Sequence, residues 1–226
     1  MPEPRIGFLQ EAKRWWDKWL KGIETGVEDD PDLRLYLMES EPPRAWYLER
    51  KGRWIAQEFR TAPVRQMHLN GDALADTAGP VDRLVNCPAD TGMNAGEYCA
   101  IWLGPDLPSD QRRDDAYSVC FDSAALAEPL AIVGAPMVEV EVTSATPVAQ
   151  LAVRLNDVRP DGSTVRITYG VLNLTHRDSA ETPEPMPIGA PVRVRFALDQ
   201  IAYELPEGHR LRLSISNAYW PLIWPV

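Results

Sequence analysis

Hydrophobic and polar positions follow a helical repeat near the start of the chain. The apolar positions recur at steps of one, three and four and form one face: Phe8, Ala12, Trp15, Trp16, Trp19 and Ile23. Charged residues take the opposite side, and Gly22 is placed to cap the helix at its C-terminus. The pattern predicts an amphipathic helix over about residues 6–21. Because aromatic stripes usually fill cores, we expect its three Trp side chains to pack against another part of a protein.

The period changes to two at residue 33. Leu33, Leu35 and Leu37 alternate with larger or charged residues, which predicts a short strand over about 33–38. The acidic run 28–32 precedes this strand. It lacks the spacing of a calcium-binding EF-hand loop, so we interpret it as a solvated turn.

Strand patterns dominate after about residue 45. Alternation of apolar and polar residues is clearest in the segments 137–142, 150–155, 165–174, 192–198 and 211–215. Past Gly170 the apolar phase shifts by one residue, which suggests a β-bulge at that glycine. Each strand has one apolar face, so we expect each sheet to have one buried side. So many strands in the remaining chain predict a mainly β protein, a two-sheet sandwich or jelly roll.

Composition and charge narrow the classes of function. Of the 226 residues, 45% are hydrophobic and 25% are charged, as in ordinary globular proteins. No run of about 18 apolar residues occurs, so we expect no membrane span. The formal charge is 23 − 33 = −10, and residues 61–226 contribute 21 acids against 12 bases. Nucleic acids and anionic membranes are therefore not expected partners, because both need a basic surface.

The cysteines do not indicate a metal site or a disulfide framework. Cys87, Cys99 and Cys120 are odd in number and lack the C-x-x-C spacing of a zinc site. Free, buried or half-buried thiols are the simplest interpretation, and they favour a cytoplasmic location. No apolar signal region follows Met1, although a chain cut at its N-terminus would have lost one.

No catalytic constellation is recognisable in the sequence. A serine hydrolase needs a nucleophile on a strained turn, and no G-x-S-x-G motif occurs. His68, His176 and His209 lie on or beside predicted strands, without metal-ligand spacing. There is no Walker A loop and no G-x-G-x-x-G motif. We therefore expect no catalytic, cofactor-binding or metal-binding residues in this chain.

Several segments, taken together and in order, resemble one family. The chain is similar to the cocaine-esterase-like, X-prolyl-dipeptidyl-peptidase family of serine hydrolases, and the ending Tyr219-Trp220-Pro221 resembles its acyl esterase branch. The resemblance covers nearly the whole chain. The segments that carry it are 7–22, 32–38, 109–121, 155–162, 173–179, 208–216 and 219–225.

The resemblance implies a piece of a larger enzyme. Family members combine an α/β-hydrolase domain, a helical cap and a C-terminal jelly roll, and their Ser, Asp and His triad precedes the helix at 6–21. None of the three histidines here matches the triad position. We therefore expect residues 1–44 to be a remnant of the α/β-hydrolase domain. Residues 45–226 are expected to form a jelly-roll (galactose-binding-like) β-sandwich, cut short at its C-terminus.

The resemblance also implies an accessory function. The domain would brace the catalytic domain of an acyl esterase or X-Pro dipeptidyl-peptidase and help to shape its pocket. In some members a jelly-roll loop lines the acyl pocket. The comparable loop here, about residues 90–103, does not match residue by residue. Its Met93, Tyr98 and Trp102 are candidates by chemistry alone.

The expected partner is the missing α/β-hydrolase domain. Without it, Trp15, Trp16 and Trp19 would be buried in a homo-oligomer or by folding of the helix back onto the sandwich.

A different class of function stays open: a free-standing module that binds carbohydrate or protein. Its candidate residues are the aromatic side chains outside the helix: Trp46, Trp54, Trp102, Trp220 and Trp224.

Overall fold

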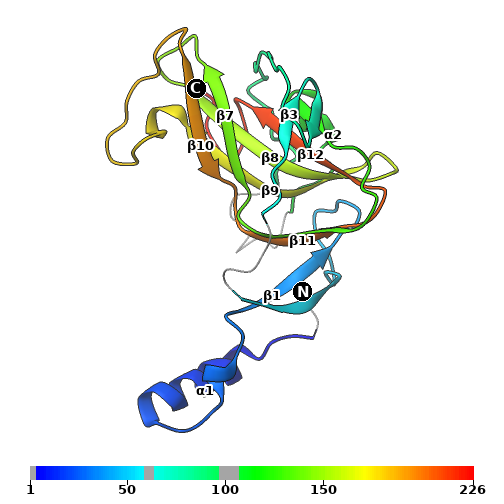
Figure 1. Cartoon of the computed structure of the whole chain (residues 1–226), viewed down its shortest axis with the longest axis vertical. Helices are drawn as coiled ribbons and strands as arrows, with labels where there is room; N and C mark the ends of the chain where they lie inside the picture. Colours follow the sequence, from blue (N-terminus) through cyan, green and yellow to red (C-terminus); the bar gives the residue numbers. More distant parts are fainter. Residues whose placement is uncertain (1–3, 59–63, 97–106) are drawn as a thin grey trace.

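The protein is mainly β, as a computed structural model of residues 4–58, 64–96 and 107–226 shows (Figure 1). Its helices are α1 (Phe8–Lys21) and α2 (Arg112–Ala116), with two short 3-10 turns, η1 (Val27–Asp29) and η2 (Leu174–His176). The strands are β1 (Leu33–Glu39), β2 (Gly52–Gln57), β3 (His68–Asn70), β4 (Ala73–Ala75), β5 (Val119–Asp122), β6 (Leu130–Gly134), β7 (Met137–Thr143), β8 (Gln150–Val158), β9 (Thr164–Asn173), β10 (Pro191–Ala197), β11 (Ile201–Leu205) and β12 (Arg210–Ser216).

One layer of the sandwich is a six-stranded sheet. Its strand order is β3-β4-β5-β12-β8-β9, and only β4 and β5 run parallel. On β8, Leu151, Val153 and Leu155 point to the same face, because side chains alternate along a strand. This face forms one wall of the core.

The second layer is a bent antiparallel ribbon. β6 pairs with β11, and β7 pairs with β10. Because β6 leads into β7 and β10 leads into β11, the two pairs form one long ribbon with a corner. At this corner the Leu198 N–H donates to the Pro136 carbonyl at 2.8 Å.

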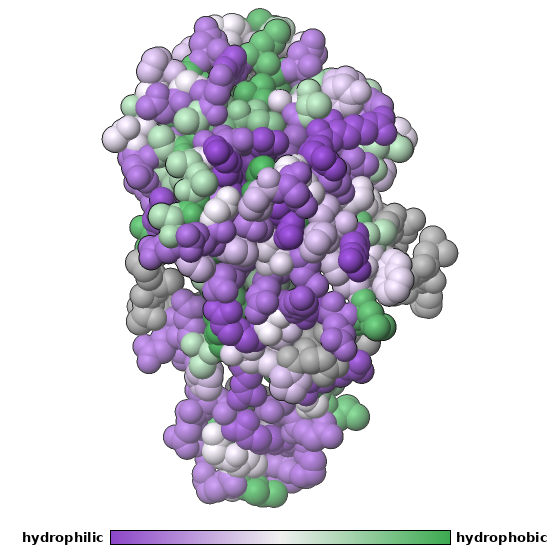
Figure 2. All heavy atoms as spheres, turned by 90° about the vertical axis from the view of Figure 1, so that its right-hand side faces the viewer, coloured by the Kyte–Doolittle hydropathy of each residue, from purple (hydrophilic) through white to green (hydrophobic). Residues whose placement is uncertain are grey.

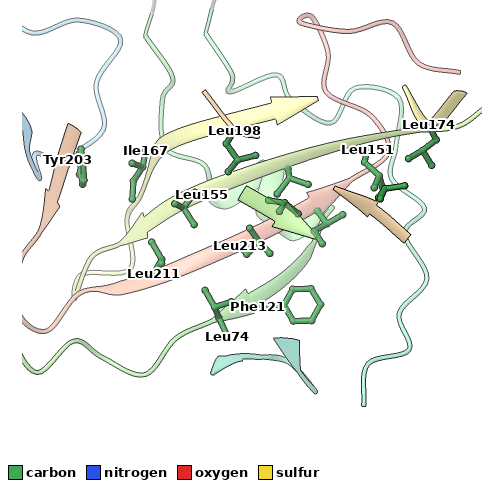
Figure 3. Packing of buried hydrophobic residues seen from close by; sticks show 14 of the residues in the cluster. Leu74, Phe121, Leu151, Leu155, Ile167, Leu174, Leu198, Tyr203, Leu211 and Leu213 are labelled. Atoms are coloured by element: carbon green, nitrogen blue, oxygen red, sulfur yellow. The ribbon is translucent and has the colours of Figure 1, made fainter. Parts of the chain in front are cut away.

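The main core lies between the two layers. Phe121, Leu155 and Leu213 come from the six-stranded sheet, and Leu198 and Tyr203 come from the ribbon side (Figure 3). Each of these side chains is at most 9% exposed. A β-sandwich is therefore confirmed, while its jelly-roll connectivity stays a prediction.

The N-terminal segments extend from the ribbon. β1 pairs antiparallel with β2 over six residue pairs and parallel with β11 at Met38↔Tyr203 and Glu39↔Glu204. The helix α1 begins at Phe8, two residues later than expected, and ends at Lys21, followed by Gly22, whose φ of 68° suits a glycine cap. Figure 1 shows α1 at the far end of the molecule from the six-stranded sheet.

One expectation about local structure was wrong, and another is narrowed. Of the two expected ways of covering α1, folding back onto the sandwich is not seen, since its three Trp side chains are about half exposed, and burial in a homo-oligomer stays a prediction. The acidic run 28–32 is a mostly exposed turn, as expected, and its Glu28 and Asp30 also form ion pairs with α1. The irregularity in β9 lies near Ile167, where the pairing with β8 slips between Leu155 and Asn156.

Gly170 has a different role from the predicted bulge. A Cβ at this position would lie 2.9 Å from the Ala197 carbonyl oxygen and 2.9 Å from Leu198 Cδ2. The residue thus lets the ribbon corner approach β9 closely.

The polar face of β8 is also buried, against the expectation of one buried side per sheet. Arg154, Asn156 and Ala152 are fully buried on the side that faces away from the main core. They are covered by residues near α2 and by the C-terminal segment, in which Tyr219 is buried beside Ala152.

Candidate interdomain interface

The apolar face of α1 is open to solvent. Phe8 is 78% exposed and Leu20 is 72% exposed, while Trp15, Trp16 and Trp19 are each about half exposed. The rings of Trp15 and Trp19 pack on each other with centroids 5.7 Å apart. In the view of Figure 2 the lower end of the molecule, which α1 forms, is mostly hydrophilic, with a few hydrophobic atoms at its tip. The sequence pattern of this helix is thus confirmed, and its apolar face stays largely exposed in the part of the chain that the structure describes.

The polar face of α1 is occupied by the chain that follows the helix. Arg14 donates from Nη2 to Asp30 Oδ1 at 2.7 Å and from Nε to the Thr25 carbonyl at 3.1 Å. Lys18 binds Glu24 at 2.9 Å and also contacts Glu28. The 22–30 loop therefore packs on the charged side of the helix and leaves the apolar side free.

The one buried residue of α1 is an acid, Asp17. Lys13 and Lys21, one turn away on either side, both bind its carboxylate. Hydrogen bonds from these ammonium groups lower the pKa of Asp17. A soluble helix normally buries its apolar face and exposes its charges. The reversed arrangement here is typical of an interaction surface.

A second set of residues fixes a turn beside α2, on the side of the six-stranded sheet that faces away from the main core. The Asp114 carboxylate accepts the N–H of Gly92 and the N–H of Asn94, each at 3.0 Å. Met93, between these two residues, is 51% exposed. Asp114 is fully buried, so this turn is held rigidly from below. Tyr98 and Trp102, the other candidates in this loop, lie outside the described residues, as does Cys99.

Sequence reasoning missed the buried polar cluster around Arg154. The Arg154 guanidinium lies 3.2 Å from Asp115 and donates to the Ser118 hydroxyl at 2.6 Å and to Gln111 at 3.4 Å. Burial raises the pKa of Asp115, while the positive charges of Arg154 and Arg212 oppose that shift. The signal was present in the alternating polar residues of β8, which were expected to face water.

The histidines form no catalytic arrangement with the serines. His209 Nδ1 lies 2.7 Å from Asp157, and Ser40 Oγ donates to the same carboxylate at 2.6 Å. A triad needs the histidine between the serine and the acid, whereas here the acid lies between them. His176 contacts the Ser179 carbonyl, and His68 begins the short strand β3.

Metal-binding and reactive-thiol chemistry have little support within the described ranges. No group of three His, Cys, Asp or Glu residues there could hold a metal ion. Cys87 and Cys120 are free and partly buried, as expected. Burial raises the pKa of both thiols, which disfavours the reactive thiolate.

Of the tryptophans outside α1, some pack against neighbouring residues and others are exposed to solvent. Trp54 donates its ring N–H to the Pro4 carbonyl at 2.7 Å and packs edge-on against Tyr36. Trp220 and Trp224 form an edge-to-face pair with centroids 5.0 Å apart. Trp46 is exposed, and Trp102 lies outside the described residues. These positions do not assemble into one described aromatic platform for a sugar.

Residues 25–226 match the family described as the X-Pro dipeptidyl-peptidase C-terminal non-catalytic domain. Among curated proteins, the chain is 26% identical over 244 residues to a Mycobacterium bovis protein named "Putative serine esterase". It is 25% identical over 237 residues to the cocaine esterase of Rhodococcus sp.. These alignments cover 96% and 94% of this chain but only 37% and 39% of the relatives.

Solved structures show the same fold. An aminopeptidase from a marine sediment Thaumarchaeota archaeon superimposes with a TM-score of 0.70 at 16% identity, over 97% of this chain and 38% of that one. A CocE/NonD family hydrolase from Staphylococcus aureus gives 0.63 at 14% identity, over 92% and 38%. No helix among the described residues is long and apolar enough to cross a membrane.

Proposed function

Since the chain belongs to the family of X-Pro dipeptidyl-peptidase C-terminal non-catalytic domains, we propose that it braces an α/β-hydrolase domain through the apolar face of α1. An accessory, non-catalytic role follows from the family itself. The relatives named as serine and cocaine esterases extend well beyond the matched part. The reaction of the whole protein, hydrolysis of an ester or of an X-prolyl peptide, is part of this proposal.

The single observation that carries the proposal is the exposed face of α1. Phe8, Trp16 and Leu20 are each more than half exposed on a helix whose polar side is already bound to its own loop. Covering apolar surface contributes about 25 cal/mol per Å², so a partner that fits this face gains much from it. The family match begins at residue 25, after α1 has ended. The helix thus lies outside the matched non-catalytic domain, in the part of the sequence that we propose contacts the hydrolase domain.

We further propose that the turn around Met93 faces the substrate pocket of that domain. Its support is the exposed Met93 side chain on a turn that Asp114 holds rigidly. A fixed apolar side chain can limit the size of an acyl group, because a pocket discriminates by the fit of its walls.

The experiment is a test of assembly. The part of the Rhodococcus cocaine esterase outside the aligned region is co-expressed with this chain and purified through a tag on the chain. We expect a 1:1 complex that hydrolyses a p-nitrophenyl acyl ester, whereas the chain alone gives background turnover.

Matched variants locate the contact. Trp16→Ser should abolish co-purification, and Trp224→Ser should not, although Trp224 is more exposed. Equal binding by both variants would count against α1 as the contact. If the chain associates with itself and does not bind the hydrolase part, the result favours a homo-oligomer through Trp15, Trp16 and Trp19 instead.

A further inference from the structure

The N-terminal segments form one connected unit, here called the arm (residues 4–57). Arg34 on β1 reaches back to Glu11 on α1 at 3.5 Å and to Asp30 at 3.6 Å. Trp54 on β2 donates to the Pro4 carbonyl just before α1. With the β1–β2 pairing, these contacts make α1 follow the movement of β1.

The arm meets the sandwich over a narrow junction. β1 pairs with β11 at only two positions, Met38↔Tyr203 and Glu39↔Glu204, although β1 is seven residues long. The second pair sets two acids side by side, and Arg53 neutralises Glu204 with hydrogen bonds of 2.6 and 3.0 Å. So short a parallel pairing by itself fixes the orientation of the arm only weakly, and Met38 adds packing against the main core.

A buried carboxylate lies directly beyond this junction. Asp157, at the end of β8, is fully buried and accepts three hydrogen bonds from three separate segments. Ser40 Oγ of the arm donates to the carboxylate at 2.6 Å, and Tyr203 OH of β11 donates to it at 2.8 Å. The third donor is His209 Nδ1, in the turn before β12, at 2.7 Å. Arg159 also donates to Ser40 Oγ at 2.8 Å.

The energetics of burial couple these groups. A buried carboxylate is costly unless hydrogen bonds compensate its charge, so each donor to Asp157 matters. Removal of the arm would take one donor from Asp157 and one acceptor from Arg159. The Arg159 Nε already lacks a partner among the described residues. The contact between Ser40 and Asp157 is therefore stabilised only when β8, β11 and the 206–209 turn are folded together.

We propose that Asp157 is a latch that fixes the arm, and with it the apolar face of α1, at one orientation on the folded sandwich. Ser40 is the part of the latch that the arm supplies. Tyr203 and His209 are positioning residues that hold the carboxylate in place. The latch is a property of the free chain and does not depend on what covers α1.

The test is hydrogen exchange on the full chain with Ser40→Ala. A hydrogen bond to a charged group, once lost, changes a local equilibrium about tenfold or more. We expect amides of β1 and β2 to exchange about tenfold faster, while those of β8 and β12 keep their rates. Ser179→Ala is the matched control, because among the described residues its hydroxyl accepts from Glu181 and Thr182, both in its own loop.

A second variant separates the latch from general stability. Asp157→Asn keeps the size of the side chain but replaces one acceptor oxygen by a donor, so it should loosen the arm and also speed exchange near His209. The proposal is overturned if Ser40→Ala leaves β1 and β2 as protected as Ser179→Ala does. It is equally overturned if exchange in Ser40→Ala rises by the same factor in β8 and β12 as in the arm.

Discussion

Arg14 on α1 binds Asp30 across the loop that follows the helix, with its Nη2 2.7 Å from Asp30 Oδ1. The same guanidinium donates to the Thr25 and Gly26 carbonyls. One side chain thereby holds the polar face of the helix to its own loop. The apolar face is presented already folded, which lowers the ordering cost of binding.

Arg14→Gln should loosen α1 without unfolding the sandwich. We expect faster amide exchange and a smaller helical signal for residues 8–21, with the exchange of β8 unchanged, because Arg14 contacts only the arm in the bonds described here. The control is Arg195→Gln on the exposed side of β10, which should change neither. If α1 in Arg14→Gln exchanges at the rate of the unsubstituted chain, the loop contacts do not organise the helix.

Asp114→Ala should destabilise the protein by at least about 2 kcal/mol, because the N–H groups of Gly92 and Asn94 lose their buried acceptor. Urea unfolding measures this loss. Asp90→Ala removes a half-exposed acid that pairs with Arg113 at 3.3 Å, and its effect should stay within about 0.5 kcal/mol. Similar midpoints for the two variants would show that Asp114 does not anchor the turn.

Cys87 and Cys120 should react slowly with a thiol reagent at pH 8. Burial raises the pKa of each thiol above its ordinary value, so the thiolate fraction at this pH falls. A Cys99→Ser variant limits the measurement to these two thiols. We expect both to react in a slow phase that becomes fast in denaturant. An immediate reaction of two thiols in the folded chain would refute the burial argument.

Removal of residues 1–23 should leave the sandwich folded and less prone to associate, because it deletes α1 but keeps β1. Removal of residues 1–44, at the boundary expected from the sequence, also deletes β1. β11 then loses its parallel neighbour and Asp157 loses Ser40. We expect the longer truncation to lower the thermal midpoint by several degrees more than the shorter one. Equal midpoints would place β1 outside the cooperative unit.

The sequence predicts those elements whose pattern is clean. Val138, Val140 and Val142 alternate with glutamates, and the strand lies where the alternation places it. β2 contains the continuous apolar run Trp54-Ile55-Ala56, which hides the alternation of a strand. β3 and β4 have three residues each, which is too short for an alternating pattern to be recognised in the sequence. The sequence predicts that α1 is an amphipathic helix, but only the structure shows that the sandwich leaves its apolar face exposed.

Buried polar contacts were the least predictable part. Asp157, Ser40 and His209 are far apart in the sequence, and no local pattern pairs them. Arg154 and Asn156 look like the solvent side of a strand, because alternation does not reveal that a second layer of chain covers them. Such contacts depend on the tertiary path of loops, which propensity and period do not encode.

The most direct measurement places a photo-crosslinking phenylalanine derivative at position 16 of the full chain, co-expressed with the part of the Rhodococcus cocaine esterase outside the aligned region, which the proposal takes as the hydrolase portion. If α1 docks on that domain, irradiation joins residue 16 to the hydrolase portion, and the same probe at position 224 does not. Crosslinks from residue 16 to the chain's own sandwich, or to a second copy in the presence of the hydrolase portion, would contradict the proposed docking.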